Sequence, residues 1–201
     1  AANPESMIIT TLGVIADTHI PDARRQLHPR VRPIFEQAGV SAILHAGDIS
    51  IPRGLRDLEA IAPVVAVRGN RDWFGFEDLR MVRIIEVAGA TIGLTHGHAD
   101  LRTYIYDKVR FFIRGPRSFD YFARQAAAQL PADVDAVVFG HNHDPMIKWE
   151  GSKLIFNPGS ASYQVLGDKP PSVGLLHIED GQLRPELVYL DDPSNWPKRS
   201  K

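Results

Sequence analysis

Five short apolar runs in this chain each end at residues that can bind a metal ion. The residues that follow the runs are Asp17-Thr18-His19, Gly47-Asp48, Gly69-Asn70, His96-Gly97-His98 and Gly140-His141-Asn142-His143. Each run is rich in Val, Ile, Leu or Ala, which is typical of a strand that is covered on both faces. We therefore expect five buried strands whose carboxyl ends present carboxylate, amide and imidazole side chains.

The first part of the chain alternates strands with helices. The apolar pattern predicts strands over Met7–Ala16, Ala42–Leu44 and Val64–Val67, and helices over Val31–Ala38 and Pro52–Ile61. This alternation indicates an α/β protein with a parallel sheet. Because the carboxyl ends of parallel strands meet at one edge of the sheet, we expect Asp17, Asp48 and Asn70 to lie close together.

After residue 80 the predicted strands follow one another directly. The expected hairpins pair Met81–Val87 with Ala90–Thr95, Met146–Glu150 with Lys153–Asn157, and Val173–Glu179 with Leu183–Leu190. The sequence contains no internal repeat and no linker that would divide it. We therefore expect one domain over residues 7–190, followed by a polar tail over residues 191–201.

The segment 101–131 differs in composition from the rest of the chain. It holds six basic residues and two acidic residues, interleaved with seven aromatic ones. Phe119, Phe122, Ala126 and Leu130 have helical spacing within it. This spacing favours a helical insertion whose aromatic face packs on a sheet. The alternative is a cap that offers basic groups to a phosphorylated ligand.

The charge and cysteine content narrow the functions that this chain can have. The 23 Lys and Arg residues nearly balance the 24 Asp and Glu residues, so no global field attracts nucleic acid or a membrane. The absence of cysteine excludes disulfides, thiolate zinc sites and cysteine nucleophiles. No apolar run is long enough to span a bilayer, and residues 1–6 are too short and polar for a secretory signal, so we expect a cytoplasmic protein.

The strand-end side chains together suit a metal pair. They are Asp17, His19, Asp48, Asn70, His96, His141 and His143. One carboxylate can bridge two cations, which leaves three groups for each. Two divalent ions about 3.5 to 4 Å apart can share a water, lower its pKa and bind a phosphoryl oxygen. A mixture of oxygen and nitrogen ligands suits Mn²⁺, Fe²⁺ or Zn²⁺ better than Ca²⁺ or Mg²⁺. A single structural metal is the alternative, and each motif alone is more often an ordinary turn.

At these motifs the sequence resembles the calcineurin-like metallophosphoesterases. Within them it is similar to the small bacterial and archaeal phosphodiesterases that are related to the retromer scaffold subunit of eukaryotes. Gly69-Asn70-Arg71-Asp72 and Asn157-Pro158-Gly159-Ser160 belong to the same pattern, which covers the chain from Met7 to about Leu190. The resemblance implies a four-layer αββα sandwich, in which helices flank two mixed sheets and the site lies at one sheet edge.

The resemblance also implies a division of the ligands between two metals. Asp17, His19 and His143 would bind one metal. Asn70, His96 and His141 would bind the other, with Asp48 bridging the two. We expect manganese at both positions, with iron, zinc or nickel as alternatives.

One position departs from the family pattern. Many larger relatives have a histidine after the asparagine, as proton donor to the leaving group, where this chain has Arg71. Arginine keeps its proton near neutral pH, so we expect Arg71 to stabilise phosphate charge instead. His98 and His45 are candidates for a proton donor or for an orienting hydrogen bond. His28 and His177 lie outside every motif and are expected to be structural or surface residues.

The sequence therefore predicts a metal-dependent phosphoesterase that acts on phosphodiesters of small molecules. A metal-bridging hydroxide would attack phosphorus, and we expect Asp48, Asn70, Arg71 and His98 to take part in catalysis. One alternative is a scaffold that keeps the fold and binds protein partners. Another is a nuclease that uses the segment 101–131, although the near-neutral charge and the lack of a nucleic-acid module count against it. The sequence is compatible with a homo-oligomer.

Overall fold

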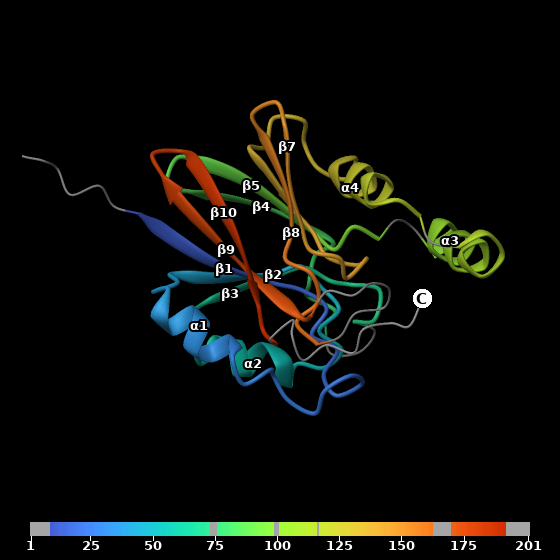
Figure 1. Cartoon of the computed structure of the whole chain (residues 1–201), viewed down its shortest axis with the longest axis horizontal. Helices are drawn as coiled ribbons and strands as arrows, with labels where there is room; N and C mark the ends of the chain where they lie inside the picture. The colour runs from blue at the N-terminus through green and yellow to red at the C-terminus, as the bar shows by residue number, and fades with distance from the viewer. Residues whose placement is uncertain (1–8, 73–75, 99–100, 116, 163–169, 192–201) are drawn as a thin grey trace, which may run out of the picture.

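A computed structural model of the chain describes residues 9–72, 76–98, 101–115, 117–162 and 170–191. Two five-stranded sheets lie face to face, with helices on their outer sides (Figure 1). Both sheets mix parallel and antiparallel pairs. The predicted α/β class and the αββα sandwich of two mixed sheets are therefore confirmed.

The first sheet carries the three parallel strands that were predicted from the start of the chain. Its order is β10-β9-β1-β2-β3, formed by β1 (Thr10–Ile15), β2 (Ala42–His45), β3 (Val64–Ala66), β9 (Ser172–Glu179) and β10 (Gln182–Tyr189). β1, β2 and β3 are parallel, and β9 and β10 extend the sheet as an antiparallel hairpin. Helices α1 (Val31–Gln37) and α2 (Arg53–Glu59) connect the parallel strands.

The second sheet has the order β4-β5-β6-β8-β7. Its strands are β4 (Val82–Val87), β5 (Ala90–Thr95), β6 (Ala136–Val138), β7 (Met146–Glu150) and β8 (Lys153–Asn157). β5, β6 and β8 run parallel, while β4 and β7 are antiparallel hairpin partners at the two edges. The three predicted hairpins are therefore present. Ala88 and Gly89, with φ of 47° and 80°, make the two-residue turn that closes the first hairpin of this sheet.

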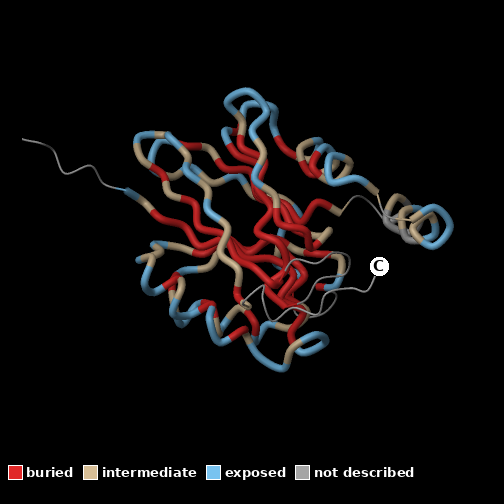
Figure 2. Tube along the Cα trace, viewed as in Figure 1, coloured by how far each residue is buried: buried red, intermediate tan, exposed pale blue. Residues whose placement is uncertain are grey.

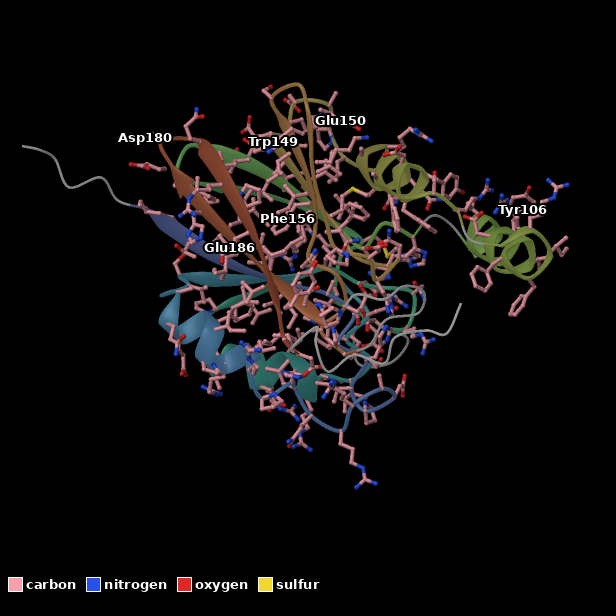
Figure 3. All side chains as sticks on the ribbon, viewed as in Figure 1. Tyr106, Trp149, Glu150, Phe156, Asp180 and Glu186 are labelled. Atoms are coloured by element: carbon pink, nitrogen blue, oxygen red, sulfur yellow. The ribbon has the colours of Figure 1, made fainter. Side chains whose placement is uncertain are left out.

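The main core lies between the two sheets, and smaller cores lie under the helices. Leu12 and Val14 from β1 pack against Ile92 and Leu94 from β5 and against Phe156 from β8. Figure 2 shows this buried layer, and Figure 3 places Phe156 between the sheets. Since alternate residues of a strand face opposite sides, the same strands also bury side chains beneath α1 and α2 on one side and α4 (Phe119–Ala127) on the other.

The predicted insertion forms two helices, α3 (Leu101–Arg114) and α4, but among the residues that the structure describes only those of α4 pack on a sheet as expected. Phe122 and Ala126 pack there. The expectation is wrong for Phe119, which is 49% exposed, because it is the first residue of α4 and helical side chains tilt toward the N-terminal end. It is also wrong for Phe112 of α3, which is 83% exposed because α3 stands away from both sheets (Figure 1).

None of the described helices is long and apolar enough to cross a membrane. Met7 and Ile8 of the expected first strand lie outside the described residues, as do residues 192–201 of the expected tail.

Candidate metal centre

The loops that follow the strands meet at one end of the sandwich. Backbone hydrogen bonds join them: the Asp17 N–H donates to Gly47 O at 3.0 Å, the His19 N–H to Asp48 O at 3.1 Å, and the Gly140 N–H to His96 O at 3.2 Å. The last of these bonds links loops from neighbouring strands of the second sheet. Neighbouring loops within each sheet are therefore joined to one another rather than being separate surface turns.

Five of the predicted ligand residues adopt a left-handed backbone conformation. Asp17, His19, Asp48, His141 and His143 have φ between 47° and 73°. Aspartate and histidine enter this region more readily than most non-glycine residues, and such conformations cluster at functional sites. Each loop thereby turns sharply after its strand, which brings its side chain over the edge of the sheet.

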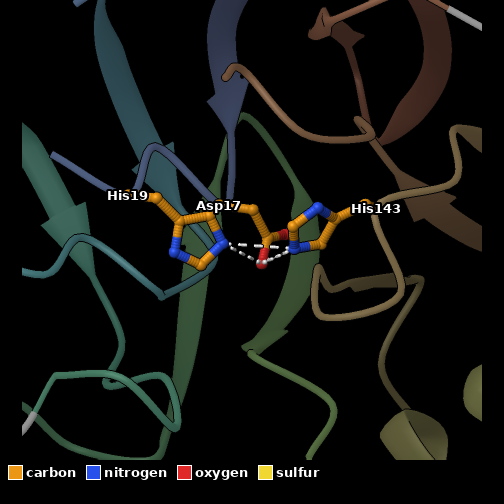
Figure 4. A group of neighbouring side chains, drawn as sticks. All are labelled: Asp17, His19 and His143. Carbon is orange, nitrogen blue, oxygen red and sulfur yellow. Dashed lines mark hydrogen bonds and ion pairs between the residues drawn. The ribbon is translucent and has the colours of Figure 1, made fainter. Parts of the chain in front are cut away.

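The first group of ligand atoms comes from the loop after β1 and from the loop after β6 (Figure 4). Nε2 of His143 lies 3.2 Å from Oδ1 of Asp17 and 3.2 Å from Nε2 of His19. Nε2 of His19 is 3.7 Å from the same Asp17 oxygen. All three residues are buried, and Oδ1 of Asp17 has no hydrogen-bond partner within the described part of the chain. A buried anionic oxygen between two imidazole nitrogens suits a cation.

The second group lies beside the first and is centred on Asn70. Oδ1 of Asn70 is 3.0 Å from Nε2 of His96 and 3.0 Å from Nδ1 of His141. Asp48 lies between the groups, with Oδ1 3.4 Å from Nε2 of His96 and Oδ2 3.8 Å from Nε2 of His19. The structure therefore brings all seven predicted ligand residues together, with Asp48 in a position from which it can reach both groups.

The hydrogen bond of His96 orients its ring for metal binding. Nδ1 of His96 donates to the carbonyl oxygen of Ala46 at 2.7 Å. In the neutral ring this leaves the lone pair on Nε2, which faces the oxygens of Asp48 and Asn70. Two oxygens and a nitrogen with their lone pairs turned toward one another repel unless a cation lies between them. The residues present therefore fit a metal site.

The electrostatics keep the imidazoles of His19 and His141 neutral. Burial lowers the pKa of His19 to about 4 and lowers the pKa of His141 well below its usual value. Burial also opposes ionisation of Asp17, but the neighbouring His143, His96 and His19 outweigh it and lower the pKa of the Asp17 carboxyl. At neutral pH this gives two unprotonated imidazoles near an ionised carboxylate, which is the state that binds metal.

Asp48 behaves differently from Asp17. Burial raises the pKa of its carboxyl to about 6, with the charge of Asp17 acting in the same direction and His96 opposing it. The metal-free centre therefore disfavours a second ionised carboxylate. A bound divalent cation would remove this cost, because it supplies the positive charge that two neighbouring carboxylates need.

Asp72 holds the two loops that carry Asp48 and Asn70. Its buried carboxylate accepts four backbone hydrogen bonds, from the N–H groups of Asp48, Ile49, Ser50 and Gly69 at 3.0, 2.8, 2.8 and 2.7 Å. Asp72 was part of a recognised motif, but the sequence pattern gave it no role. Four amide N–H groups on one carboxylate fix the backbone next to Asp48 and Asn70. Asp72 therefore positions the ligand residues without being a metal ligand itself.

Other residues position the ligands through the backbone. Oγ of Ser160 and Oγ of Ser162 donate to Asp17 O at 2.9 and 2.8 Å, which fixes the turn after β1. Two glycines allow the loops to approach closely: a Cβ on Gly69 would overlap the Asp48 backbone, and one on Gly140 would lie 2.7 Å from Oδ2 of Asp17. The motifs contained Ser160, Gly69 and Gly140, whereas Ser162 was not identified from the sequence.

The remaining predicted residues lie around the centre. The ring of His98 lies 5.2 Å from that of His96, and burial lowers the pKa of His98 to about 4. His45 is fully buried, and its Nδ1 accepts from the Gly47 N–H at 3.2 Å. Its Nε2 therefore donates to Oγ1 of Thr18 at 3.2 Å, as an orienting role requires. The Arg71 side chain is exposed at the rim, 3.9 Å from Oδ2 of Asp22.

His28 and His177 are distant from the centre and have structural contacts, as predicted. Nε2 of His28 is 3.0 Å from Oδ1 of Asp191, and Nδ1 of His177 is 3.0 Å from Oγ1 of Thr11.

Comparisons with known proteins identify the family to which the chain is similar. A calcineurin-like phosphoesterase superfamily domain matches residues 11–181. A probable metallophosphoesterase of Methanothermobacter thermautotrophicus is 36% identical over 183 residues, which cover 90% of this chain and 94% of the relative. A phosphodiesterase of Methanocaldococcus jannaschii is 24% identical over 188 residues, or 88% of this chain and 98% of the relative. Among solved structures, Entamoeba histolytica Vps29 complexed with Zn²⁺ has a TM-score of 0.62 and 27% identity, covering 90% of this chain and all of that one.

Proposed function

Because the chain belongs to the calcineurin-like phosphoesterase superfamily, we propose that it is a phosphodiesterase that works with two divalent cations. The observation that carries this proposal is the continuous set of seven buried or partly buried donor residues at one end of the sandwich. Two candidate cation groups within that set share Asp17.

The donor set divides between the two cations as follows. Asp17, His19 and His143 would hold one ion, since their atoms form the first group. Asn70, His96 and His141 would hold the other, and Asp48 would bridge. When bound, the two ions would supply Lewis-acid activation of water and neutralise charge on the phosphoryl group. Manganese fits this mixture of imidazole, amide and carboxylate ligands, with iron, zinc or nickel as alternatives.

The protein's own residues provide orientation and charge. The Ala46 carbonyl fixes the His96 ring, and the serines fix Asp17 through its backbone. Arg71 anchors Asp48, because its backbone N–H donates to Oδ1 of Asp48 at 2.8 Å. Its guanidinium is exposed and interacts weakly with Asp22, so it is available to a negatively charged phosphodiester at the rim. His98 would orient a ligand or transfer a proton beside His96.

We expect hydrolysis of an aryl phosphodiester to depend on added metal. Protein treated with a chelator should lose its activity, because the ionised carboxylate and neutral imidazole of the centre act by holding a cation that the chelator removes. Added Mn²⁺ should restore the activity. The rate is measured from the absorbance of the aryl alcohol that hydrolysis releases. Equal rates with chelator and with Mn²⁺ would contradict the proposed function.

Replacing Arg71 with glutamine should lower kcat/KM for the same diester. A hydrogen bond to a charged group contributes about 1.5 to 3 kcal/mol, so we expect a loss of roughly tenfold to hundredfold. Arg71→Lys should recover part of it. Arg53→Gln, which removes an exposed arginine from α2, is the matched control and should leave the rate unchanged. If the Arg71→Gln enzyme kept the wild-type kcat/KM, Arg71 would have no role in the mechanism.

The second candidate function is a scaffold that binds protein partners, which the fold shared with Vps29 favours. The complete donor set favours catalysis over this alternative. A protein that turned over no phosphoester with any of the four metals would reverse this ranking. Strongly salt-dependent binding of DNA or RNA would instead favour a nuclease.

A further inference from the structure

Helix α3 exposes an apolar side that neither sheet covers. Tyr106, Val109, Phe112 and Ile113 are 58%, 53%, 83% and 73% exposed. At about 100° per residue these four positions fall within about 120° of the helix surface, so they form one face. Figures 2 and 3 show α3 standing away from the sandwich, with Tyr106 on it. A surface helix normally turns its apolar face toward the core, and α3 does the opposite.

The polar side of α3 is fixed to the rest of the insertion. Oδ1 of Asp107 accepts a hydrogen bond from Nε of Arg117 at 3.1 Å, and Oδ2 accepts one from the Tyr121 hydroxyl of α4 at 2.8 Å. The Arg117 guanidinium lies over the Tyr121 ring, 4.2 Å from its centre. These contacts hold α3 with its polar side toward α4. The apolar face therefore points outward because of specific bonds.

The same segment is strongly basic. Residues 101–117 hold five basic residues, Arg102, Lys108, Arg110, Arg114 and Arg117, and one acidic residue, Asp107, which is a difference of +4 in a chain whose net charge is −1. Arg114 is exposed and directly follows Ile113. At about 100° per residue, Arg110 lies directly beside the exposed apolar face and Arg114 lies farther round the same helix.

We propose that α3 binds the surface of an anionic lipid membrane. Phe112, Ile113 and Val109 would enter the boundary between headgroups and acyl chains, and Arg114 would reach the lipid phosphates. Charge complementarity selects this partner over a second copy of the chain, because two copies would bring two basic faces together. This role for α3 does not depend on the proposed catalysis.

The place of α3 in the fold connects membrane binding to the metal centre. α3 begins three residues after His98, and the ring of Phe122 in α4 lies 5.7 Å from that of His141. The insertion that carries the apolar face therefore adjoins the loops of the metal centre.

Co-sedimentation with lipid vesicles tests the proposal. The full chain should partition onto vesicles of roughly one quarter phosphatidylglycerol in phosphatidylcholine at least about tenfold more strongly than onto pure phosphatidylcholine. Replacing Phe112 and Ile113 together with serine should lower the partition by about tenfold or more, since both side chains are exposed and bury their area only at the membrane. Arg114→Gln should lower it severalfold, and added salt should weaken the wild type.

Matched control variants distinguish vesicle binding through α3 from nonspecific adsorption through other exposed apolar or basic residues. The pair Ile147→Ser and Trp149→Ser removes exposed apolar side chains from β7, and Arg53→Gln removes an exposed arginine from α2. Both controls should bind as the wild type does. Equal partition of the wild type and the Phe112→Ser, Ile113→Ser double variant would overturn the proposal. A second result would also overturn the proposal. In that result the wild type forms a dimer in sedimentation velocity but does not bind vesicles, and the double variant does not form the dimer.

The hydrolysis of a soluble aryl phosphodiester by the double variant should equal that of the wild type, because neither side chain lies in the donor set. Failure of membrane binding therefore leaves the proposed hydrolase activity standing, and failure of hydrolysis leaves membrane binding standing.

Discussion

Replacing Asp48 with asparagine should lower the rate of aryl phosphodiester hydrolysis by roughly a thousandfold or more, because the bridging position contributes several kcal/mol of transition-state stabilisation through the metal pair. Asparagine keeps the shape of the side chain and can still accept the 2.8 Å hydrogen bond from the Arg71 N–H. What it loses is the charge and the second ligand oxygen. The Mn²⁺-loaded variant and wild type should be compared at saturating diester.

The stability of the Asp48→Asn variant distinguishes loss of function from loss of folding. In the metal-free protein burial raises the pKa of Asp48 to about 6, above the usual value of 3.8 for an aspartate. The folded state therefore holds this proton more tightly than the unfolded state, and its contribution to stability is lost as pH rises from about 4 through 6. A neutral asparagine avoids that loss. At pH 7 the metal-free variant should unfold at the same temperature as the wild type or higher.

A matched control for this change is Asp133→Asn, which removes an exposed carboxylate from the loop before β6, at the opposite end of that strand from His141. It should keep the wild-type rate. An Asp48→Asn enzyme with a rate within tenfold of the wild type, under the same metal loading, would show that Asp48 does not bridge the metals.

Replacing Asp72 with asparagine should weaken Mn²⁺ binding and kcat/KM by roughly tenfold to a hundredfold, the usual cost of losing a group that orients ligands. The Asp72 carboxylate accepts four backbone N–H groups. An asparagine amide nitrogen cannot accept, so two of these N–H groups would face another donor. The loops of Asp48 and Asn70 would then shift. Titration calorimetry with Mn²⁺ measures the affinity.

Excess Mn²⁺ should restore part of the activity of the Asp72→Asn variant, because all seven donor residues remain. This rescue separates a positioning role from a direct one, since Asp48→Asn should not be rescued. Asp135→Asn is the matched control: Oδ2 of Asp135 accepts a single backbone bond, from the Thr91 N–H at 2.7 Å, at the opposite end of β5. Wild-type metal affinity in a folded Asp72→Asn protein would refute the positioning role.

The strand ends were predictable from the sequence because the apolar runs are short and each stops at a polar residue. β7 and β8 begin and end at the predicted residues, and β1–β3 are parallel as the alternation with helices indicated. The proximity of Asp17, Asp48 and Asn70 follows from that topology alone. The approach of His96 and His141 from the second sheet could be inferred only from the family resemblance, since it depends on how two sheets stack.

Two features were not predictable, for different physical reasons. The role of Asp72 depends on two loops folding over one carboxylate, and periodicity carries no information about backbone hydrogen bonds in loops. The orientation of α3 could not be found from its pattern either. Helical spacing shows that an apolar face exists, whereas the bonds of Asp107 decide that this face meets solvent.

The most direct test of the central claim is anomalous scattering from crystals grown with excess Mn²⁺. Two peaks should appear about 3.5 to 4 Å apart beyond the ends of β1 and β6, a separation typical of paired catalytic metals. One peak should lie among Asp17, His19 and His143 and the other among Asn70, His96 and His141, with Asp48 reaching both. A single peak, or none, at full Mn²⁺ loading would contradict it.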